Sequence, residues 1–192
     1  MIVLASGSAT RRQLLERAGL DFVVDTAPVD EAAVKRAFTD PTLAAEALAE
    51  LKAVRVSPRH PGALVIGADQ MLDCDGAWFD KPEDAAAARR QLVRLRGHRH
   101  RLTSAVAVVK DGRCLWRHAE AAELAMRPFS DAFLDRYLAA AGPAVLGAVG
   151  AYHLEGLGAQ LFSAVTGDYF TILGLPLLPL LGFLRDHGEL GS

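Results

Sequence analysis

The first dozen residues join a short apolar segment directly to the start of a helix. Met1–Ala5 is typical of a buried strand, Ser6-Gly7-Ser8 of a tight turn, and Arg11–Leu15 of the opening turns of a helix. A strand that runs straight into a helix is a building unit of α/β folds. The hydroxyl residues can cap the helix, whose free N–H groups and positive dipole end attract anions. The segment therefore predicts an α/β chain with an anion site near its beginning.

Arg11 strengthens the prediction of an anion site. At about 100° per residue, it lies on the helix face that Leu14, Leu15 and Ala18 turn inward, whereas Arg12 points away. An inward-facing cation near a helix N-terminus opposes the helix dipole unless a negative group binds there. The alternative is an ordinary strand–turn–helix, and between the two we favour a phosphate site.

The composition is that of a globular protein. The 192 residues are 51% hydrophobic and 23% charged, which allows one α/β domain or two closely packed lobes and excludes disorder. The net charge of −2 provides no basic field for nucleic acid. No apolar run reaches membrane-spanning length, and the first residues lack signal-peptide features. Because Cys74 and Cys114 match no zinc spacing, we expect reduced thiols in a cytoplasmic protein.

The apolar patterns predict a mixed α/β sheet flanked by helices. Helices are expected over about 41–57, 82–97, 130–141 and 175–187, and strands over 21–24, 63–68, 102–109 and 114–125. Two short strands should flank Asp75-Gly76, and Asp111-Gly112 should close a longer hairpin. The glycine-rich stretch 142–167 is expected to mix loop with short strands.

Four charged residues occupy places where an ordinary fold has little use for them. Asp69 closes the apolar strand 63–68, at an edge where α/β proteins place ligands and catalysts. Glu31 follows Asp30 within a proline-containing loop, Lys52 lies on the flank of the helix 41–57, and Lys81 precedes Pro82. Each has an ordinary explanation alone: a turn residue, a solvated carboxylate, or a lysine at the rim of the core.

Together with Ser6, Ser8 and Arg11, these residues describe a site for a polyphosphate. The three cations and the helix start can neutralise phosphate oxygens, while Asp69 and Glu31 can hold a divalent metal or orient water. Hydrolysis of a phosphoanhydride needs positioned water, charge neutralisation and a general base.

Other sites and partners have weaker support in the sequence. The chain contains no GxxxxGK[ST] loop and no GxGxxG after a strand. His98 and His100 would share a strand face, but they lack a third zinc ligand. The basic stretch 89–101 follows helical spacing, so we interpret it as a solvated helix face with a possible oligomer contact, in preference to a nucleic-acid site.

The order and spacing of several short motifs resemble those of the Maf-like nucleotide pyrophosphatases, a family first associated with bacterial septum formation. The motifs are 4–8 with 11–12, 30–31, 52–53, 66–70, 81–82, 150–152 with 155–158, and 167–169 with 174–176. The resemblance implies a cytoplasmic enzyme that cleaves a nucleoside triphosphate between the α and β phosphates, in nucleotide-pool sanitation. It also implies a divalent metal (Mg or Mn), frequent homodimers, and a two-lobed, Maf/ITPase-like α/β domain over 1–192 with a central cleft.

The resemblance also assigns roles to individual residues. Asp69 matches the family's proton acceptor and, with Glu31, would hold the metal. Four further residues match family positions that would contact phosphate: Ser8, Arg11, Lys52 and Lys81. Ser6, in the turn before the first helix, is expected to contact phosphate as well. Substrate specificity is attributed in the family to the positions of Thr10, Gln70 and Glu155.

Gln70 and Glu155 resemble the branch of the family that hydrolyses 7-methyl-GTP, and a carboxylate suits the N1–H and N2 donors of guanine. Thr10 replaces a large aromatic of that branch, and Ala9 replaces the usual Pro of the first motif. We therefore favour 7-methyl-GTP as the substrate, with dTTP/UTP or a broader set of modified nucleotides as the alternative. A non-enzymatic regulator of cell division is the competing hypothesis from another class.

Overall fold

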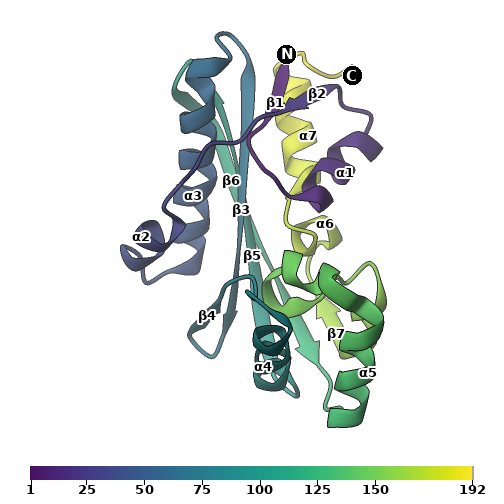
Figure 1. The fold of residues 1–192 in the computed structure, drawn as a ribbon. Coiled ribbons are helices and arrows are strands. Elements are labelled where there is room, and N and C mark those ends of the chain that lie inside the picture. Colours follow the sequence, from purple (N-terminus) through teal and green to yellow (C-terminus); the bar gives the residue numbers. More distant parts are fainter. Residues whose placement is uncertain (192) are drawn as a thin grey trace. The chain divides into compact units, whose positions relative to one another are not determined.

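The computed structural model describes residues 1–191, which form two compact units (Figure 1). The first unit contains Met1–Gln70, Thr103–Glu120 and the described residues from Tyr169 onward, and the second contains Met71–Leu102 and Ala121–Asp168. Three strands contribute residues to both units: β3 (Leu64–Cys74), β5 (Arg99–Lys110) and β6 (Arg113–Met126). Among the described residues, no helix is long and apolar enough to cross a membrane.

The seven-stranded sheet is mixed. Its order is β2-β1-β3-β5-β6-β7, with β4 paired to β3. The strands β1 (Ile2–Leu4) and β2 (Phe22–Val24) are parallel to each other, and β1 is parallel to β3, whereas β4 (Ala77–Phe79) and β7 (Phe162–Thr166) pair antiparallel with β3 and β6. The predicted mixed α/β sheet with flanking helices is therefore confirmed.

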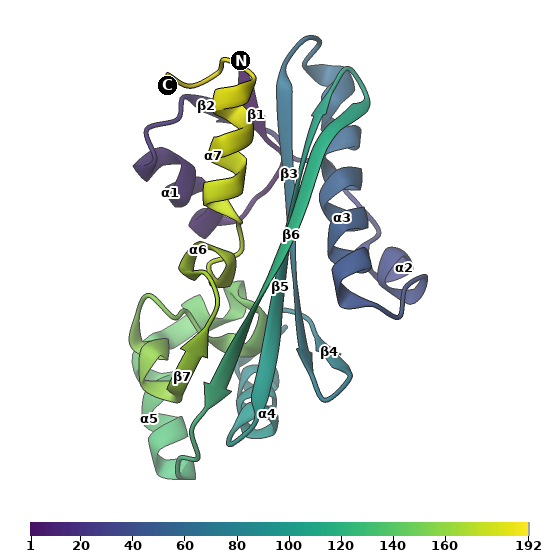
Figure 2. The same ribbon diagram turned by 180° about the vertical axis from the view of Figure 1, so that it is seen from behind.

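In the first unit, helices cover both faces of the sheet (Figures 1 and 2). On one face, Leu4 packs in a core that includes α1 (Ala9–Arg17) and α7 (Leu177–Asp186). On the other, Val3 packs in a core that includes α3 (Pro41–Val56). Because successive strand residues point to opposite faces, both sides of β1 are buried, which explains its uninterrupted apolar sequence. The unit also contains α2 (Glu31–Arg36), the 3₁₀ helix Ser57–Arg59 and α6 (Tyr169–Ile172).

The second unit contains α4 (Ala85–Leu95), α5 (Asp131–Ala141), β4 and β7. Asp84 and Ser130 cap the two helices by accepting hydrogen bonds from the backbone N–H groups of Ala87 and Phe133. The glycine-rich stretch forms three 3₁₀ helices (Gly142–Gly147, Val149–Ala151 and Leu157–Leu161) before β7. Of the short strands expected in this stretch, the described chain contains one, β7, and 3₁₀ helices occupy much of the remainder.

Three local predictions are wrong. The strand 63–68 does not end at Asp69 but continues to Cys74, because Met71, Leu72 and Cys74 extend its buried pattern and β4 pairs with its end. Glu31 does not close a loop but begins α2, which Asp30 caps. His98 and His100 do not share a face, since His100 is buried in β5 while His98 precedes the strand and is exposed. The central cleft and the single domain over 1–192 stay predictions.

Candidate functional site

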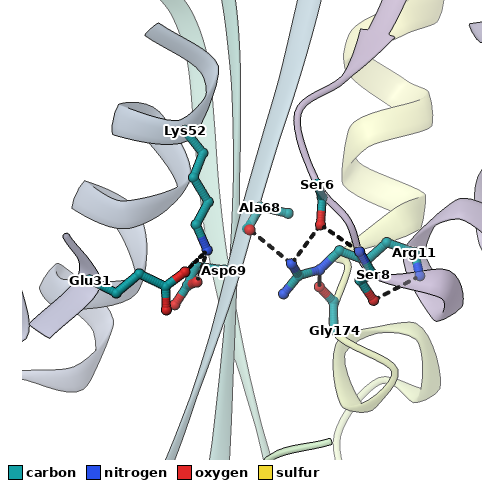
Figure 3. Close-up of polar contacts among 8 residues, drawn as sticks. All are labelled: Ser6, Ser8, Arg11, Glu31, Lys52, Ala68, Asp69 and Gly174. Carbon is teal, nitrogen blue, oxygen red and sulfur yellow. Dashed lines mark hydrogen bonds and ion pairs between the residues drawn. The ribbon is translucent and has the colours of Figure 1, made fainter. Parts of the chain in front are cut away.

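Arg11 is fixed inside the first unit by neutral oxygens (Figure 3). The Ser8 hydroxyl caps α1 by accepting from the Arg11 backbone N–H at 3.4 Å, which places Arg11 in the first turn. The guanidinium donates through Nε to the Gly174 carbonyl at 2.7 Å, and through Nη1 to Ser6 Oγ at 3.1 Å and to the Ala68 carbonyl at 2.9 Å. The predicted inward orientation of Arg11 is confirmed.

The surroundings of Arg11 leave its charge poorly neutralised. Burial lowers the pKa of the guanidinium, although the nearby carboxylates of Asp69 and Glu31 act in the opposite direction. Within residues 1–191, no acceptor is hydrogen-bonded to its Nη2 atom, and the residue is only 9% exposed. A buried cation with a remaining donor is suited to an anionic ligand, and a phosphate oxygen is such a ligand.

Lys52 joins two carboxylates that come from different elements. Its Nζ atom, carried by α3, lies 2.7 Å from Asp69 Oδ1 on β3 and 2.7 Å from Glu31 Oε1 on α2 (Figure 3). The Asp69 side chain is 7% exposed and that of Lys52 is 16% exposed, whereas Glu31 is 45% exposed. The ammonium therefore stabilises an otherwise buried carboxylate, and Glu31 closes the arrangement on its solvent side.

One carboxylate oxygen of Asp69 lies apart from its contact with Lys52. Its Oδ2 atom is buried and has no hydrogen-bond partner among the described residues. A buried carboxylate oxygen without a donor is costly and signals a missing proton, water or cation. This oxygen can accept a proton from water or bind a metal ion.

The carboxylates fit a divalent cation that is bound together with phosphate. Over residues 1–191, no group of three or more His, Cys, Asp or Glu side chains is arranged to hold a metal. Mg²⁺ commonly takes one or two carboxylates and completes its octahedron with substrate phosphates and water. Glu31 and Asp69 are sufficient for that mode of binding, and the buried Asp69 Oδ2 atom is consistent with it.

Gln70 follows Asp69 and is bonded to residues far along the chain. Its Nε2 atom lies 3.0 Å from Ser104 Oγ, 3.2 Å from the Thr171 carbonyl and 2.9 Å from the Ile172 carbonyl. Thr10, the other specificity residue of this unit, is half-buried in α1. The first unit thus brings together most of the expected site, namely Ser6, Ser8, Thr10, Arg11, Glu31, Lys52, Asp69 and Gln70.

Lys81 and Glu155 belong to the second unit, where both act on His153. Glu155 Oε1 lies 3.5 Å from His153 Nδ1, and the positive charge of Lys81 opposes protonation of the same ring. Their predicted contacts with phosphate and base stay predictions.

Within each unit, several groups that contact the predicted site residues follow no pattern in the sequence. The Ala68 and Gly174 carbonyls that fix Arg11 carry no side-chain signal, and Thr171 and His153 follow no pattern that marks them. Ser104 offered a weak signal, because it is a fully buried hydroxyl within the apolar run 102–109.

These features define a class: a mixed α/β protein in which a strand–turn–helix segment carries a buried arginine and a lysine joins two carboxylates in the same unit. Residues 1–187 match the family described as "Maf-like protein", and the chain belongs to this family. A relative from Paramagnetospirillum magneticum is 64% identical over 98% of this chain and 99% of its own length, and is named nucleoside triphosphate pyrophosphatase. A relative of the same name from Granulibacter bethesdensis is 53% identical over 98% of each chain. A Rhizobium etli relative named 7-methyl-GTP pyrophosphatase is 49% identical, covering 98% of this chain and 97% of its own.

Proposed function

We propose that this chain is a nucleoside triphosphate pyrophosphatase. It adds water across the bond between the α and β phosphates and releases a nucleoside monophosphate and pyrophosphate. The observation that carries the proposal is the Lys52–Asp69–Glu31 cluster, in which one buried carboxylate oxygen has no partner among the described residues. The names of the relatives that are 64% and 53% identical support the same reaction.

We assign proton transfer and phosphate binding to different residues. Asp69 Oδ2 takes the proton of the attacking water, while the Lys52 ammonium, 2.7 Å from Oδ1, holds the carboxylate in place. Arg11, with the hydroxyls of Ser6 and Ser8 at the start of α1, binds phosphate oxygens. Lys81 is proposed to contribute a further cation from the second unit.

Glu31 and Asp69 would hold a divalent cation, magnesium or manganese. When bound, such an ion would neutralise negative charge on the phosphates of the substrate. Because the protein supplies only two carboxylates, we expect the ion to bind far more tightly with nucleotide present than alone.

We propose 7-methyl-GTP as the preferred substrate. Gln70 and Glu155, the residues that match the 7-methyl-GTP branch, and the name of the relative that is 49% identical support this choice. The relative that is 64% identical carries the broader name, so dTTP, UTP and modified nucleotides form the alternative set. Thr10 is proposed as the third specificity residue, and the homodimer and cytoplasmic location stay predictions.

The test is pyrophosphate release by the purified protein with magnesium or manganese, across the common and methylated nucleoside triphosphates. We expect pyrophosphate and monophosphate in equal amounts, with 7-methyl-GTP turned over fastest and no turnover after chelation. A preference for dTTP or UTP would support the proposed reaction and contradict 7-methyl-GTP as the preferred substrate. If the folded protein released no pyrophosphate from any nucleotide, the proposal of an enzyme would be wrong, and the hypothesis of a regulator of cell division would be favoured.

A further inference from the structure

The side-chain amide of Gln70 is surrounded by hydrogen-bond acceptors on one side. The carbonyls of Thr171 and Ile172 can only accept, and both lie within 3.2 Å of Gln70 Nε2. Ser104 is the third neighbour, and its hydroxyl donates its own proton to the Thr171 carbonyl at 2.7 Å. Ser104 therefore presents lone pairs to Gln70 and accepts from Nε2 at 3.0 Å. Three acceptors on one side leave a single orientation for this amide, with its nitrogen facing them.

The carbonyl oxygen of Gln70 is consequently turned to the opposite side. No donor within residues 1–191 is hydrogen-bonded to Oε1, and Gln70 is half-buried. A Cβ atom placed on Gly174 would lie 3.6 Å from this oxygen and 3.5 Å from Arg11 Nε. The oxygen thus lies near the guanidinium that we assign to phosphate, at a place where Gly174 leaves space.

The support behind Gln70 is rigid. Ser104 and Thr171 have no exposed surface, and the Thr171 hydroxyl donates to Glu120 Oε2 at 2.8 Å. The cluster therefore ties β3, β5 and β6 to α6, within the first unit. Deleting the Ser104 hydroxyl would leave the Gln70 amide with fewer acceptors and would allow other rotamers of this side chain.

We propose that Ser104 is a positioning residue that makes Gln70 present only an acceptor to the nucleoside. This inference rests on the proposed function and adds to it the kind of group that is selected. A fixed acceptor favours a hydrogen-bond donor, which is either an N–H on the pairing edge of the base or a sugar hydroxyl. Guanine, 7-methylguanine, uracil and thymine carry such a ring N–H, whereas adenine and cytosine present a lone pair there. UTP and dUTP differ by one sugar hydroxyl.

The experiment compares Ser104→Ala with Thr103→Val. Both variants delete a buried hydroxyl from β5, but Thr103 is outside the cluster around Gln70. The first readout is the pair of Gln70 side-chain amide proton resonances, assigned by their disappearance in Gln70→Glu. We expect slow exchange with solvent in the wild type and in Thr103→Val, and exchange at least tenfold faster in Ser104→Ala.

The second readout is kcat/KM for GTP and 7-methyl-GTP against ATP, for UTP against CTP, and for UTP against dUTP. Loss of one hydrogen bond should lower the selectivity of Ser104→Ala roughly three- to tenfold. The loss should appear either in the comparisons between nucleotides that differ in the base or in the comparison of UTP with dUTP, which differ in the sugar. The pair that changes identifies the donor. Gln70→Leu, which removes the acceptor and keeps Ser104 bonded to Thr171, should lose the same selectivity.

Two results overturn the proposal: unchanged amide exchange in Ser104→Ala, or wild-type selectivity in Gln70→Leu. Because the amide resonances are observed without turnover, they test the positioning of Gln70 even if no nucleotide is hydrolysed. Absence of pyrophosphatase activity would therefore contradict the proposed function, but the amide exchange in Ser104→Ala would still test whether Ser104 positions Gln70.

Discussion

At the scale of single residues, Asp69 combines burial, a cationic neighbour and one oxygen without a partner in the described part of the chain. Lys52 stabilises the charge through Oδ1, and Oδ2 is left for water or a cation. Asp69→Asn retains the size of the side chain and removes its basicity. We expect turnover to fall roughly 10²–10⁴-fold while nucleotide binding changes little, as measured by pyrophosphate release and calorimetric titration. The control is Asp21→Asn, which alters an exposed carboxylate in the same unit and should keep wild-type activity. Full activity in Asp69→Asn would remove this residue from the chemistry.

His153 is a second residue whose state is set by its immediate partners. Its Nε2 atom lies 3.0 Å from the Ala144 carbonyl and its Nδ1 atom lies 3.5 Å from Glu155 Oε1, so both ring nitrogens face acceptors. The hydrogen bond with Glu155 raises the pKa of His153, against the effects of burial and of Lys81. In Glu155→Gln, the pKa should fall toward or below the ordinary value of 6.5, as followed by NMR titration of the ring protons. Glu83→Gln, an exposed change in the same unit, should leave the titration where it is. An unshifted His153 in Glu155→Gln would show that the two side chains do not interact in solution.

At the scale of elements, Gly67 sets how closely α3 approaches β3. A Cβ atom at this position would lie 2.0 Å from the Ala49 carbonyl oxygen and 2.9 Å from the Ala53 nitrogen, both in the backbone of α3. Gly67→Ala must therefore move the helix that carries Lys52 away from the strand that carries Asp69. We expect a loss of about 1–3 kcal/mol or more in the free energy of unfolding, together with reduced kcat. Denaturant titration and pyrophosphate release measure the two effects. The control is Gly147→Ala, which has open space around the added methyl group and should change neither the free energy of unfolding nor kcat. If Gly67→Ala were as stable as the wild type, α3 could not pack as closely on β3 as the structure shows.

The sequence predicts the elements well where one local signal dominates. The helices expected to begin near 41 and 130 follow local signals, since Pro41 lies in the first turn of α3 and Asp40 and Ser130 cap α3 and α5, and the structure confirms both helices and the Asp111-Gly112 turn. The sequence pattern ends β3 too early, because Asp69, a polar residue after an apolar run, resembles a strand terminus. Its burial depends on Lys52 from another element, which no local pattern contains.

At the scale of the whole chain, the fold class follows from the alternation of apolar strands and helices, whereas the site depends on distant contacts. Arg11 was recognisable from its helix face, but its carbonyl partners lie 57 and 163 residues away. Backbone carbonyls have no sequence signature, and their positions are decided by the packing of the sheet and helices. The sequence therefore predicts which residues form the site, and the structure adds which groups orient them.

The stability of the second unit should depend on pH through His100. This side chain is 3% exposed and is bonded to Tyr152 Oη at 2.7 Å, and burial lowers its pKa from 6.5 to about 4. Because the unfolded chain binds the proton more tightly, stability is fully present above pH 6.5 and is lost as the pH falls from 6.5 toward 4. The shift corresponds to a loss of roughly 3 kcal/mol across this range.

His100→Gln tests this origin, because glutamine can bond the Tyr152 hydroxyl and does not titrate. Urea denaturation at several pH values between 4 and 7 should give a flatter stability profile for the variant than for the wild type, even if the variant is less stable at pH 7. His98→Gln removes an exposed histidine of the same unit and should keep the wild-type slope. If His100→Gln and the wild type lost stability in parallel, the acid sensitivity would have to come from the carboxylates. The buried histidine would then be protonated as readily in the folded chain as in the unfolded one.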